Sequence, residues 1–170
     1  MEYSGGLILY RNRTATEREF FLVHPGGVFY RTVEKGGYWG FPKGNIENSD
    51  WYRFPYSITG KPETDAALYA AIREYREETG DNTDLKPLQN IIQYIGKVLQ
   101  RKGKTVYAFA LECTWDLDTK KCYSNMIEVQ IDNKKIKIPE NDDFMWATYN
   151  ELENIVHPKH LVFYQKLVTA

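Results

Sequence analysis

Apolar residues fall in short runs along most of the chain and in a helical stripe over one segment. Short runs bounded by glycine, proline or charged residues predict β-strands. Leu68, Ile72 and Tyr75 instead recur at the i, i+4, i+7 spacing that buries one face of a helix. A chain of 170 residues is long enough for one domain with a sizeable core. The predicted strands cover residues 5–10, 19–23, 39–42, 88–99, 105–112, 125–131 and 135–138, and the predicted helices residues 62–79, 149–155 and 158–168.

The long helix carries start and stop signals and an unusual group of acids. Pro62 suits a first helical turn, and Gly80 suits the left-handed residue that ends a helix. Glu74, Glu77 and Glu78 fall at i, i+3 and i+4, so their carboxylates share one patch. At a helix C-terminus these charges repel one another and oppose the helix dipole. Either this is a solvated acidic face, or a hard divalent cation such as Mg2+ reverses the penalty.

The residues from Arg73 to Gly80 form an ordered motif, Arg-Glu-Tyr-Arg-Glu-Glu-Thr-Gly. This motif resembles the C-terminal half of the Nudix box, G-x5-E-x7-R-E-U-x-E-E-x-G-U, where U is a bulky apolar residue. Asp81 departs from it, because it stands where the last apolar residue is expected. The resemblance implies an α+β fold of the Nudix type, an α/β/α sandwich with a mixed central sheet and a catalytic loop–helix–loop.

The same resemblance implies a chemistry and a set of site residues. Nudix proteins use Mg2+ or Mn2+ to hydrolyse a nucleoside diphosphate linked to another group. By this match Glu74, Glu77 and Glu78 bind the metal, and Glu77 is also a candidate catalytic residue. Arg73 is expected to pair with Glu77 one turn away and to orient its carboxylate.

A tight turn before the long helix supplies two further candidates. Phe41-Pro42-Lys43-Gly44 resembles the approach to the Nudix box, which makes Gly44 the box glycine. Its backbone is then expected to approach a metal or a phosphate, because glycine has no side chain in the way. Lys43 is expected to bind substrate phosphate; the alternative is a surface lysine.

The first acid of the box has no clear counterpart in this chain. Counting back eight residues from Arg73 leads to Asp65 in place of a glutamate. Glu47 and Glu63 are rival candidates, and the sequence does not choose among the three.

An aromatic insertion at about 48–62 separates the turn from the helix. A loop that packs on its own body is the favoured interpretation. A lid that stacks on a base is the alternative, and an exposed aromatic loop would serve a homodimer or a ligand equally well. Its aromatic residues are Trp51, Tyr52, Phe54 and Tyr56.

The second half of the chain contains three more candidates. Lys104 and Tyr107 have the spacing seen in Nudix proteins that resemble dinucleoside-polyphosphate hydrolases, which makes them candidate substrate ligands. Glu140 lies six residues before Trp146, like a late acid of that branch. Glu140 is therefore expected to complete the metal site or to take a proton from water, against the alternative of a surface acid. His157 and His160 are predicted to be capping or solvated.

Charge, apolar runs and cysteine content limit the binding partners and the cellular compartment that we expect. A net charge of −1 gives no reason to expect binding to nucleic acid or to a membrane surface. No apolar run approaches the roughly 18 residues of a membrane span. Cys113 and Cys122 form neither a disulfide framework nor a metal-binding pair. We expect a cytoplasmic protein whose partner is a small nucleotide substrate.

The resemblance favours one substrate and leaves others open. A dinucleoside polyphosphate fits best with the turn at 41–44, the spacing of Lys104 and Tyr107, and Glu140. The proline expected about 16 residues after the box in ADP-ribose cleavers is missing, since Lys97 stands there. Nucleoside triphosphate, ADP-ribose and nucleotide sugar remain alternatives. A non-catalytic domain that senses a nucleotide is the alternative from another class.

Overall fold

A mixed β-sheet forms the centre of the protein in the computed structural model, which describes residues 1–26, 37–52 and 57–168. The strand order is β4-β5-β1-β2-β8, and the short strand β3 pairs with β1. β1 runs parallel to β5 and antiparallel to β2 and β3. The sheet strands are β1 (Glu2–Asn12), β2 (Arg18–Pro25), β3 (Lys43–Asn45), β4 (Gln93–Arg101), β5 (Lys104–Glu112) and β8 (Asn141–Thr148).

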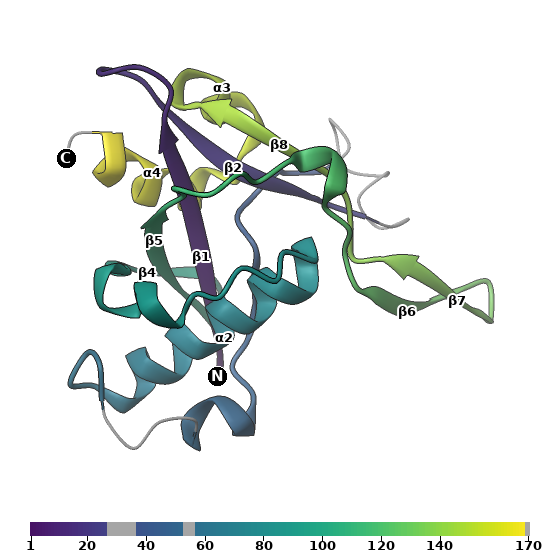
Figure 1. Cartoon of the computed structure of the whole chain (residues 1–170). Coiled ribbons are helices and arrows are strands. Elements are labelled where there is room, and N and C mark those ends of the chain that lie inside the picture. Colours follow the sequence, from purple (N-terminus) through teal and green to yellow (C-terminus); the bar gives the residue numbers. More distant parts are fainter. Residues whose placement is uncertain (27–36, 53–56, 169–170) are drawn as a thin grey trace.

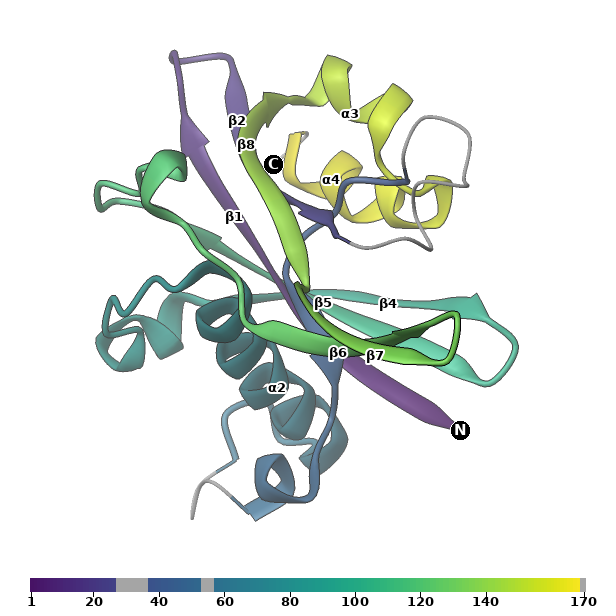
Figure 2. The same ribbon diagram turned by 90° about the vertical axis from the view of Figure 1, so that its right-hand side faces the viewer.

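Helices cover both faces of this sheet, so that its central strand is buried on both sides. Leu7 and Leu9 of β1 pack in the cluster beneath the long helix, and Ile8 packs in the cluster beneath the C-terminal helices. All three are fully buried, as expected for a continuous apolar strand covered on both faces. Figure 1 and Figure 2 show α2 on one side of the sheet and α3 and α4 on the other. The predicted α+β sandwich with a mixed sheet is confirmed.

The long helix, α2 (Pro62–Thr79), begins within the predicted range of 62–65 and ends before Gly80, as predicted. Gly80 ends it with φ of 69°, and its N–H donates to the carbonyl of Arg76 at 2.9 Å. α2 lies very close to β1, because a Cβ at Gly5 would be 1.8 Å from the carbonyl oxygen of Ala67. Glycine on the strand and alanine on the helix therefore set the distance between the two elements.

Short helices at the C-terminal end cover the other face. α3 (Tyr149–Ile155) and α4 (Leu161–Val168) flank the 3-10 turn η5 (Pro158–His160). Phe163, Tyr164 and Leu167 of α4 are buried against the sheet.

A separate two-stranded hairpin projects from the body. β6 (Met126–Ile131) pairs with β7 (Lys134–Pro139), and Asp132 and Asn133 at its tip have φ of 47° and 64°. Positive φ at both central residues is typical of a tight hairpin turn. Figure 1 shows the hairpin extending away from the sheet.

Several segments differ from the predicted elements. The strand predicted over 88–99 is wrong in its first part, because residues Lys86–Ile91 form the 3-10 helix η3 and β4 begins at Gln93. Pro87 fixes a helical φ at this position, which a run of apolar residues does not reveal. Two further 3-10 turns are η2 (Asn48–Tyr52) and η4 (Thr119–Lys121). No helix in the described part of the chain is long and apolar enough to cross a bilayer.

Candidate active site

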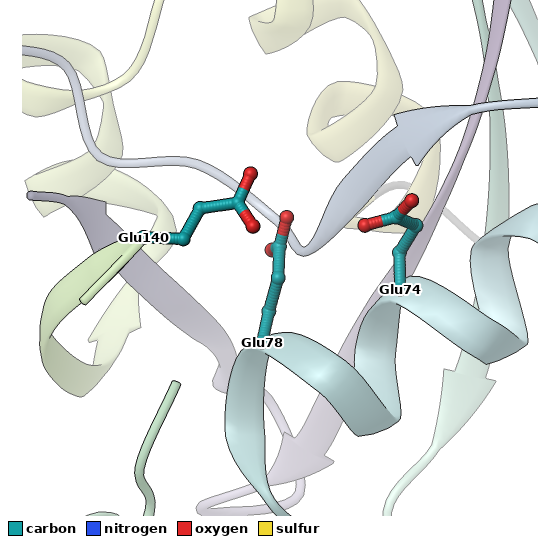
Figure 3. A group of neighbouring side chains, drawn as sticks. All are labelled: Glu74, Glu78 and Glu140. Atoms are coloured by element: carbon teal, nitrogen blue, oxygen red, sulfur yellow. The ribbon is translucent and has the colours of Figure 1, made fainter. Parts of the chain in front are cut away.

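Three glutamates meet at one end of α2. Glu74 and Glu78 come from α2, and Glu140 comes from the junction between β7 and β8. Each offers one carboxylate oxygen, and these atoms all lie within 4.8 Å of one another. Figure 3 shows the three side chains converging from the two elements. Residues four apart on a helix share a face, which explains the pair from α2.

Asn125 and Glu140 flank the β6–β7 hairpin at its base and are called the neck below. Backbone contacts of the neck hold Glu140 in place. The N–H of Glu140 donates to the carbonyl of Asn125 at 2.9 Å, and its carbonyl accepts from the N–H of Gly26 at 2.7 Å. The side-chain amide of Asn125 donates to Oε2 of Glu140 at 2.9 Å. The N–H of Asn125 in turn donates to the carbonyl of Glu77 at 2.9 Å, so the neck is attached to α2 as well.

Burial makes this group of carboxylates electrostatically unfavourable without a cation. Glu78 is only 4% exposed, and burial raises its pKa well above the usual range. Lys43 opposes this shift, while Glu140 and Glu74 add to it. Burial also raises the pKa of Glu74, although Arg73 opposes that shift. Buried carboxylate oxygens of this kind fit a hard divalent cation, which favours their charged form.

Arg73 connects the site to the segments that precede the helix. Its guanidinium donates to Glu74 at 2.7 Å, to the carboxylate of Asp50 at 3.0 Å and to the carbonyl of Asn45 at 2.9 Å. The predicted pair with Glu77 is present at 3.5 Å, but it is longer than the contact with Glu74. Asp50 is 1% exposed and was not predicted, because no sequence spacing relates it to Arg73.

Gly44 lies directly against Glu74. A Cβ at this position would be 2.0 Å from the Cδ and Oε1 atoms of the Glu74 carboxylate. The strand β3 holds Gly44 there by pairing it with Gly5 of β1. The absence of a side chain therefore leaves room for the carboxylate, and the predicted contact of the Gly44 backbone with a metal or phosphate stays a prediction.

Glu77 lies apart from the group of three. Its side chain is 45% exposed, and its carboxylate is 3.5 Å from the guanidinium of Arg73. The group found among the described residues contains Glu74, Glu78 and Glu140. The structure thus does not bring Glu77 together with the other predicted metal ligands, and its metal-binding and catalytic roles stay predictions.

The two predicted lysines lie near the acidic group, and Tyr107 is buried beneath α2. Lys43 lies close enough to Glu78 to oppose the rise in its pKa. The pKa of Lys104 is lowered, first by burial and then by the positive charge of Lys43. Tyr107 is 2% exposed and packs in the cluster beneath α2. Residues three apart on a strand point to opposite faces, and the substrate-binding roles predicted for Lys104 and Tyr107 stay predictions.

A cavity of about 330 Å³ begins at the acidic group. Lys43, Glu78 and Glu140 line one part of it. Residues of several elements line the rest, including the histidines of the C-terminal segment and Ile127 of the β6–β7 hairpin. The remaining lining residues are Val23, Pro25, Gly26, Gly37, Tyr38, Trp39, Gly40, Phe41, Gln100, Ile127, Asn141, His157 and His160.

The three candidates for the first acid of the box are not part of the acidic group of Glu74, Glu78 and Glu140. Asp65 accepts from the backbone N–H and the hydroxyl of Thr59, both at 2.8 Å, and from the hydroxyl of Ser57. It therefore anchors the loop before α2. The carboxylate of Glu47 is 3.5 Å from the guanidinium of Arg73, and its side chain is 61% exposed. Glu63 is a first-turn acid of α2.

The described part of the aromatic insertion does not line the cavity. Trp51 and Tyr52 of η2 are exposed, and neither lines the cavity. Asp50, also in η2, accepts a hydrogen bond from Arg73. The predicted packing of the aromatic residues on the body of the protein stays a prediction. Phe54 and Tyr56 lie outside the described residues.

The two histidines of the C-terminal segment differ. Nδ1 of His157 accepts from the N–H of Lys159 at 3.1 Å, which confirms the predicted capping role. His160 is 3% exposed, so the prediction that it is capping or solvated is wrong. It packs against Phe41 and Phe163 at ring-centroid distances of 5.3 and 6.2 Å.

Comparison with known proteins adds the fold class. No family model matches the chain, and no curated protein matches its sequence. Among solved structures, a NUDIX hydrolase from Alicyclobacillus acidocaldarius matches with a TM-score of 0.62 and 16% identity, over 100% of this chain and 92% of that one. The protein therefore has the Nudix fold.

Two further structures of this fold are similar to the chain. The Ap4A hydrolase of C. elegans, in a binary complex, matches with a TM-score of 0.54 and 18% identity, over 99% of this chain and 96% of that one. The NUDIX domain of Shewanella oneidensis NrtR, complexed with ADP ribose, matches with a TM-score of 0.54 and 11% identity, over 98% and 87%. Sequence identities this low show a shared fold and nothing about the activity, which has to be argued from the site.

Proposed function

We propose that the protein is a metal-dependent hydrolase that cleaves a phosphoanhydride bond in a nucleoside diphosphate linked to another group. The observation that carries this proposal is the convergence of Glu74, Glu78 and Glu140 at the mouth of a cavity. Two of these carboxylates are almost fully buried, and a fold selected only for stability has no reason to gather them.

The chain's own residues divide the work of positioning and charge neutralisation. Glu74, Glu78 and Glu140 would hold Mg2+ or Mn2+. Such an ion, when bound, neutralises phosphate charge and lowers the pKa of its water. Lys43 and Lys104 hold the negative charge of the substrate phosphates, which is the main requirement in phosphoryl transfer.

Two glutamates are candidates for the general base. Glu140 lines the cavity and is positioned by the amide of Asn125. Glu77 lies beside Arg73, away from the described cavity lining. Glu140 is therefore the better placed of the two to accept a proton from water.

A dinucleoside polyphosphate is the proposed substrate. The turn at 41–44, which brings Lys43 to the cavity, and the placement of Glu140 support it. The roles predicted for Lys104 and Tyr107 stay predictions, and Tyr107 is 2% exposed. Solved structures of the same fold include an Ap4A hydrolase and a domain bound to ADP ribose, so both ligands belong in the test.

A substrate panel with Mg2+ and product analysis tests the proposal. We expect a dinucleoside polyphosphate to be cleaved faster than nucleoside triphosphates, ADP-ribose or nucleotide sugars. Glu78→Gln should lower kcat by about 10³-fold, the scale for losing an oriented charge at the reacting centre. Glu128→Gln, an exposed glutamate of the hairpin, is the matched control and should retain full activity.

Each result of the panel has a definite meaning. Preferred cleavage of ADP-ribose would contradict the proposed substrate and would support the proposed hydrolase activity. Tight nucleotide binding without turnover of any substrate would indicate a sensing domain instead. Unchanged turnover in Glu78→Gln would rule out the role given to the three glutamates.

A further inference from the structure

In the part of the chain that the structure describes, the β6–β7 hairpin has an apolar face and no third strand. It stands apart from the central sheet (Figure 1). Its register places Ile127 opposite Ile138 on one face, and Val129 lies opposite Ile136 on the same face. A two-stranded hairpin is marginally stable in water, and further strands that extend such a face stabilise it. The hairpin therefore favours the addition of another strand.

The backbone groups that point away from β7 belong to alternate residues of β6. A two-residue turn joins the strands, so Ile131 and Lys134 flank it and exchange hydrogen bonds. The alternation of an antiparallel pair then turns the N–H and C=O groups of Glu128 and Gln130 outward. Among the described residues, no other strand pairs with these groups. β6 therefore presents an open edge.

The two outer edges of the hairpin differ in how they meet another strand. The edge of β7 carries Lys135 and Lys137 and ends in Pro139. Lysine and proline at the edge of a sheet discourage pairing with another chain. β6 has the sequence Met-Ile-Glu-Val-Gln-Ile and contains neither residue type. Of the two edges, that of β6 is the one suited to accept a strand.

The sequence of β6 is complementary to itself when two copies run antiparallel. With Val129 on a two-fold axis, each Val129 faces its own copy, and Ile127 faces Ile131 of the second copy. On the other side of the sheet Glu128 faces Gln130, so no two like charges are opposite each other. Apolar side chains then share one face across all four strands. The outward backbone groups of Glu128 and Gln130 pair with each other.

Other registers of the same two strands are less favourable. Centring the axis on Glu128 places two carboxylates opposite each other, and centring it on Gln130 places Glu128 opposite Asp132. A slip of one residue moves the apolar side chains of one copy to the polar face of the other. The sequence of β6 therefore specifies one register.

We propose that the edge of β6 is a dimer interface, to which a second copy of this chain adds its own β6 in the antiparallel orientation. The result is a continuous four-stranded sheet, β7-β6-β6-β7, with a two-fold axis at Val129. Antiparallel strands lead away from the axis in opposite directions, so the two bodies lie at opposite ends. Dimerisation needs neither a metal nor a nucleotide, and the inference is independent of the proposed hydrolysis.

The size of this contact determines the strength of the dimer. A single strand edge of six residues is smaller than the roughly 1,200–2,000 Å² of a stable interface. In strand addition the main-chain hydrogen bonds supply the affinity. We expect reversible dimerisation with a Kd between about 10 μM and 1 mM, so that the protein is monomeric at the nanomolar concentrations of an enzyme assay.

Sedimentation velocity of the full chain, from about 5 μM to about 1 mM, measures the dimerisation. Gln130→Pro removes an outward N–H and should raise the Kd at least about tenfold, because proline blocks the edge and spares the hydrogen bonds to β7. Lys135→Pro is the matched control. It changes the residue opposite Gln130, on the β7 edge, and should leave the Kd within about threefold.

Cysteine cross-linking locates the axis. Val129→Cys places two thiols opposite each other at Cα atoms about 4.5 Å apart, which is within the range of a disulfide. Oxidised glutathione should convert this variant into a covalent dimer, one disulfide forming as two molecules of reduced glutathione are released. Gln130→Cys is the control, since its two copies lie more than about 7 Å apart and should not be bridged. The original protein, with Cys113 and Cys122, measures the background.

Several results would overturn the inference. One is a protein that stays monomeric at about 1 mM, well above the Kd expected for such a contact. An unchanged Kd in Gln130→Pro, an equal rise in both proline variants, or equal cross-linking of Gln130→Cys and Val129→Cys would contradict the assigned edge and axis. A thermal unfolding scan of each variant verifies that the fold is retained. Absence of hydrolysis would remove the proposed function and leave the dimer unaffected.

Discussion

A residue with no side chain makes room for the site. Gly44 stands where any Cβ would overlap the carboxylate of Glu74. The atoms in the way are the end of a flexible side chain, so the carboxylate can move without disturbing the backbone. At this position a substitution is therefore expected to affect the proposed metal site more than the fold.

The first prediction at this scale is that Gly44→Ala lowers kcat/KM by about 10- to 100-fold, the range for displacing a group that positions a metal ligand. The melting temperature should stay within about 2 °C of the original, a change of under about 1 kcal/mol. Steady-state kinetics and a thermal scan measure the two effects.

Gly5→Ala gives the contrasting result. Its Cβ would meet the backbone of Ala67, which cannot move without shifting α2. This variant should lose stability by a few kcal/mol, as overpacked cores do. Loss of stability in Gly44→Ala on the same scale would contradict the distinction.

Sequence reasoning found some site residues and missed others for a physical reason. Glu74 and Glu78 share a helix face, so their spacing alone predicts that they are neighbours. Asp50 acquires its contact with Arg73, and His160 its burial, only through contacts between elements far apart in the chain. No periodicity encodes such contacts, and a resemblance over a short motif does not extend to them.

At the scale of elements, the hairpin and its neck have different tasks. The neck is tied to α2 through the carbonyl of Glu77 and to the residue that follows β2 through the N–H of Gly26, and it supplies Glu140. The tip, residues 128–137, projects beyond these contacts (Figure 1). The neck therefore positions the carboxylate, and the tip has no described contact with the acidic group.

Shortening the hairpin tests this division. Replacing residues 128–137 by Asn-Gly keeps the pair of Ile127 with Ile138 and supplies a favoured two-residue turn. We expect kcat/KM to stay within about threefold. Asn125→Ala, which removes the side-chain contact to Glu140, should lower kcat about 10- to 100-fold. Equal losses in the two variants would show that the whole hairpin acts as one unit.

The elements themselves were largely predictable. The helix at 62–79 and the hairpin turn at 132–134 follow from strong local signals, glycine after a helix and asparagine in a tight turn. The strand predicted from residue 88 failed, because apolar runs do not distinguish a 3-10 turn from a strand. The pairing of β1 with β5 in parallel depends on long-range contacts that no local pattern shows.

For the whole molecule, the buried carboxylates make stability depend on pH and metal. The pKa of Glu78 is raised in the folded state, so the folded protein binds more protons than the unfolded chain above about pH 4.5. Its contribution to stability is therefore present at low pH and is lost as pH rises through the folded-state pKa. His160 acts in the opposite sense, because its lowered pKa removes stability as pH falls below about 6.5.

Comparison of Glu78→Gln with the original protein isolates the first effect. Without metal, the variant should melt at a higher temperature at pH 7.5 and at nearly the same temperature at pH 4.5. Mg2+ at about 100 times its Kd should stabilise the original protein by about 2.7 kcal/mol, or about 5 to 10 °C, and the variant much less. Glu128→Gln should follow the original throughout. A variant that is less stable at pH 7.5 would refute the raised pKa.

The facing pair of Gly5 and Gly44 on β1 and β3 has an evolutionary consequence. α2 rests there on main-chain atoms, so the height of its glutamates above the sheet is set by the backbone and is independent of which apolar residues fill the interior. Interior residues can then be exchanged while the arrangement of the glutamates is kept. A fold whose spacing is set in this way tolerates wide variation of sequence, consistent with the 11–18% identity to the structures that share it.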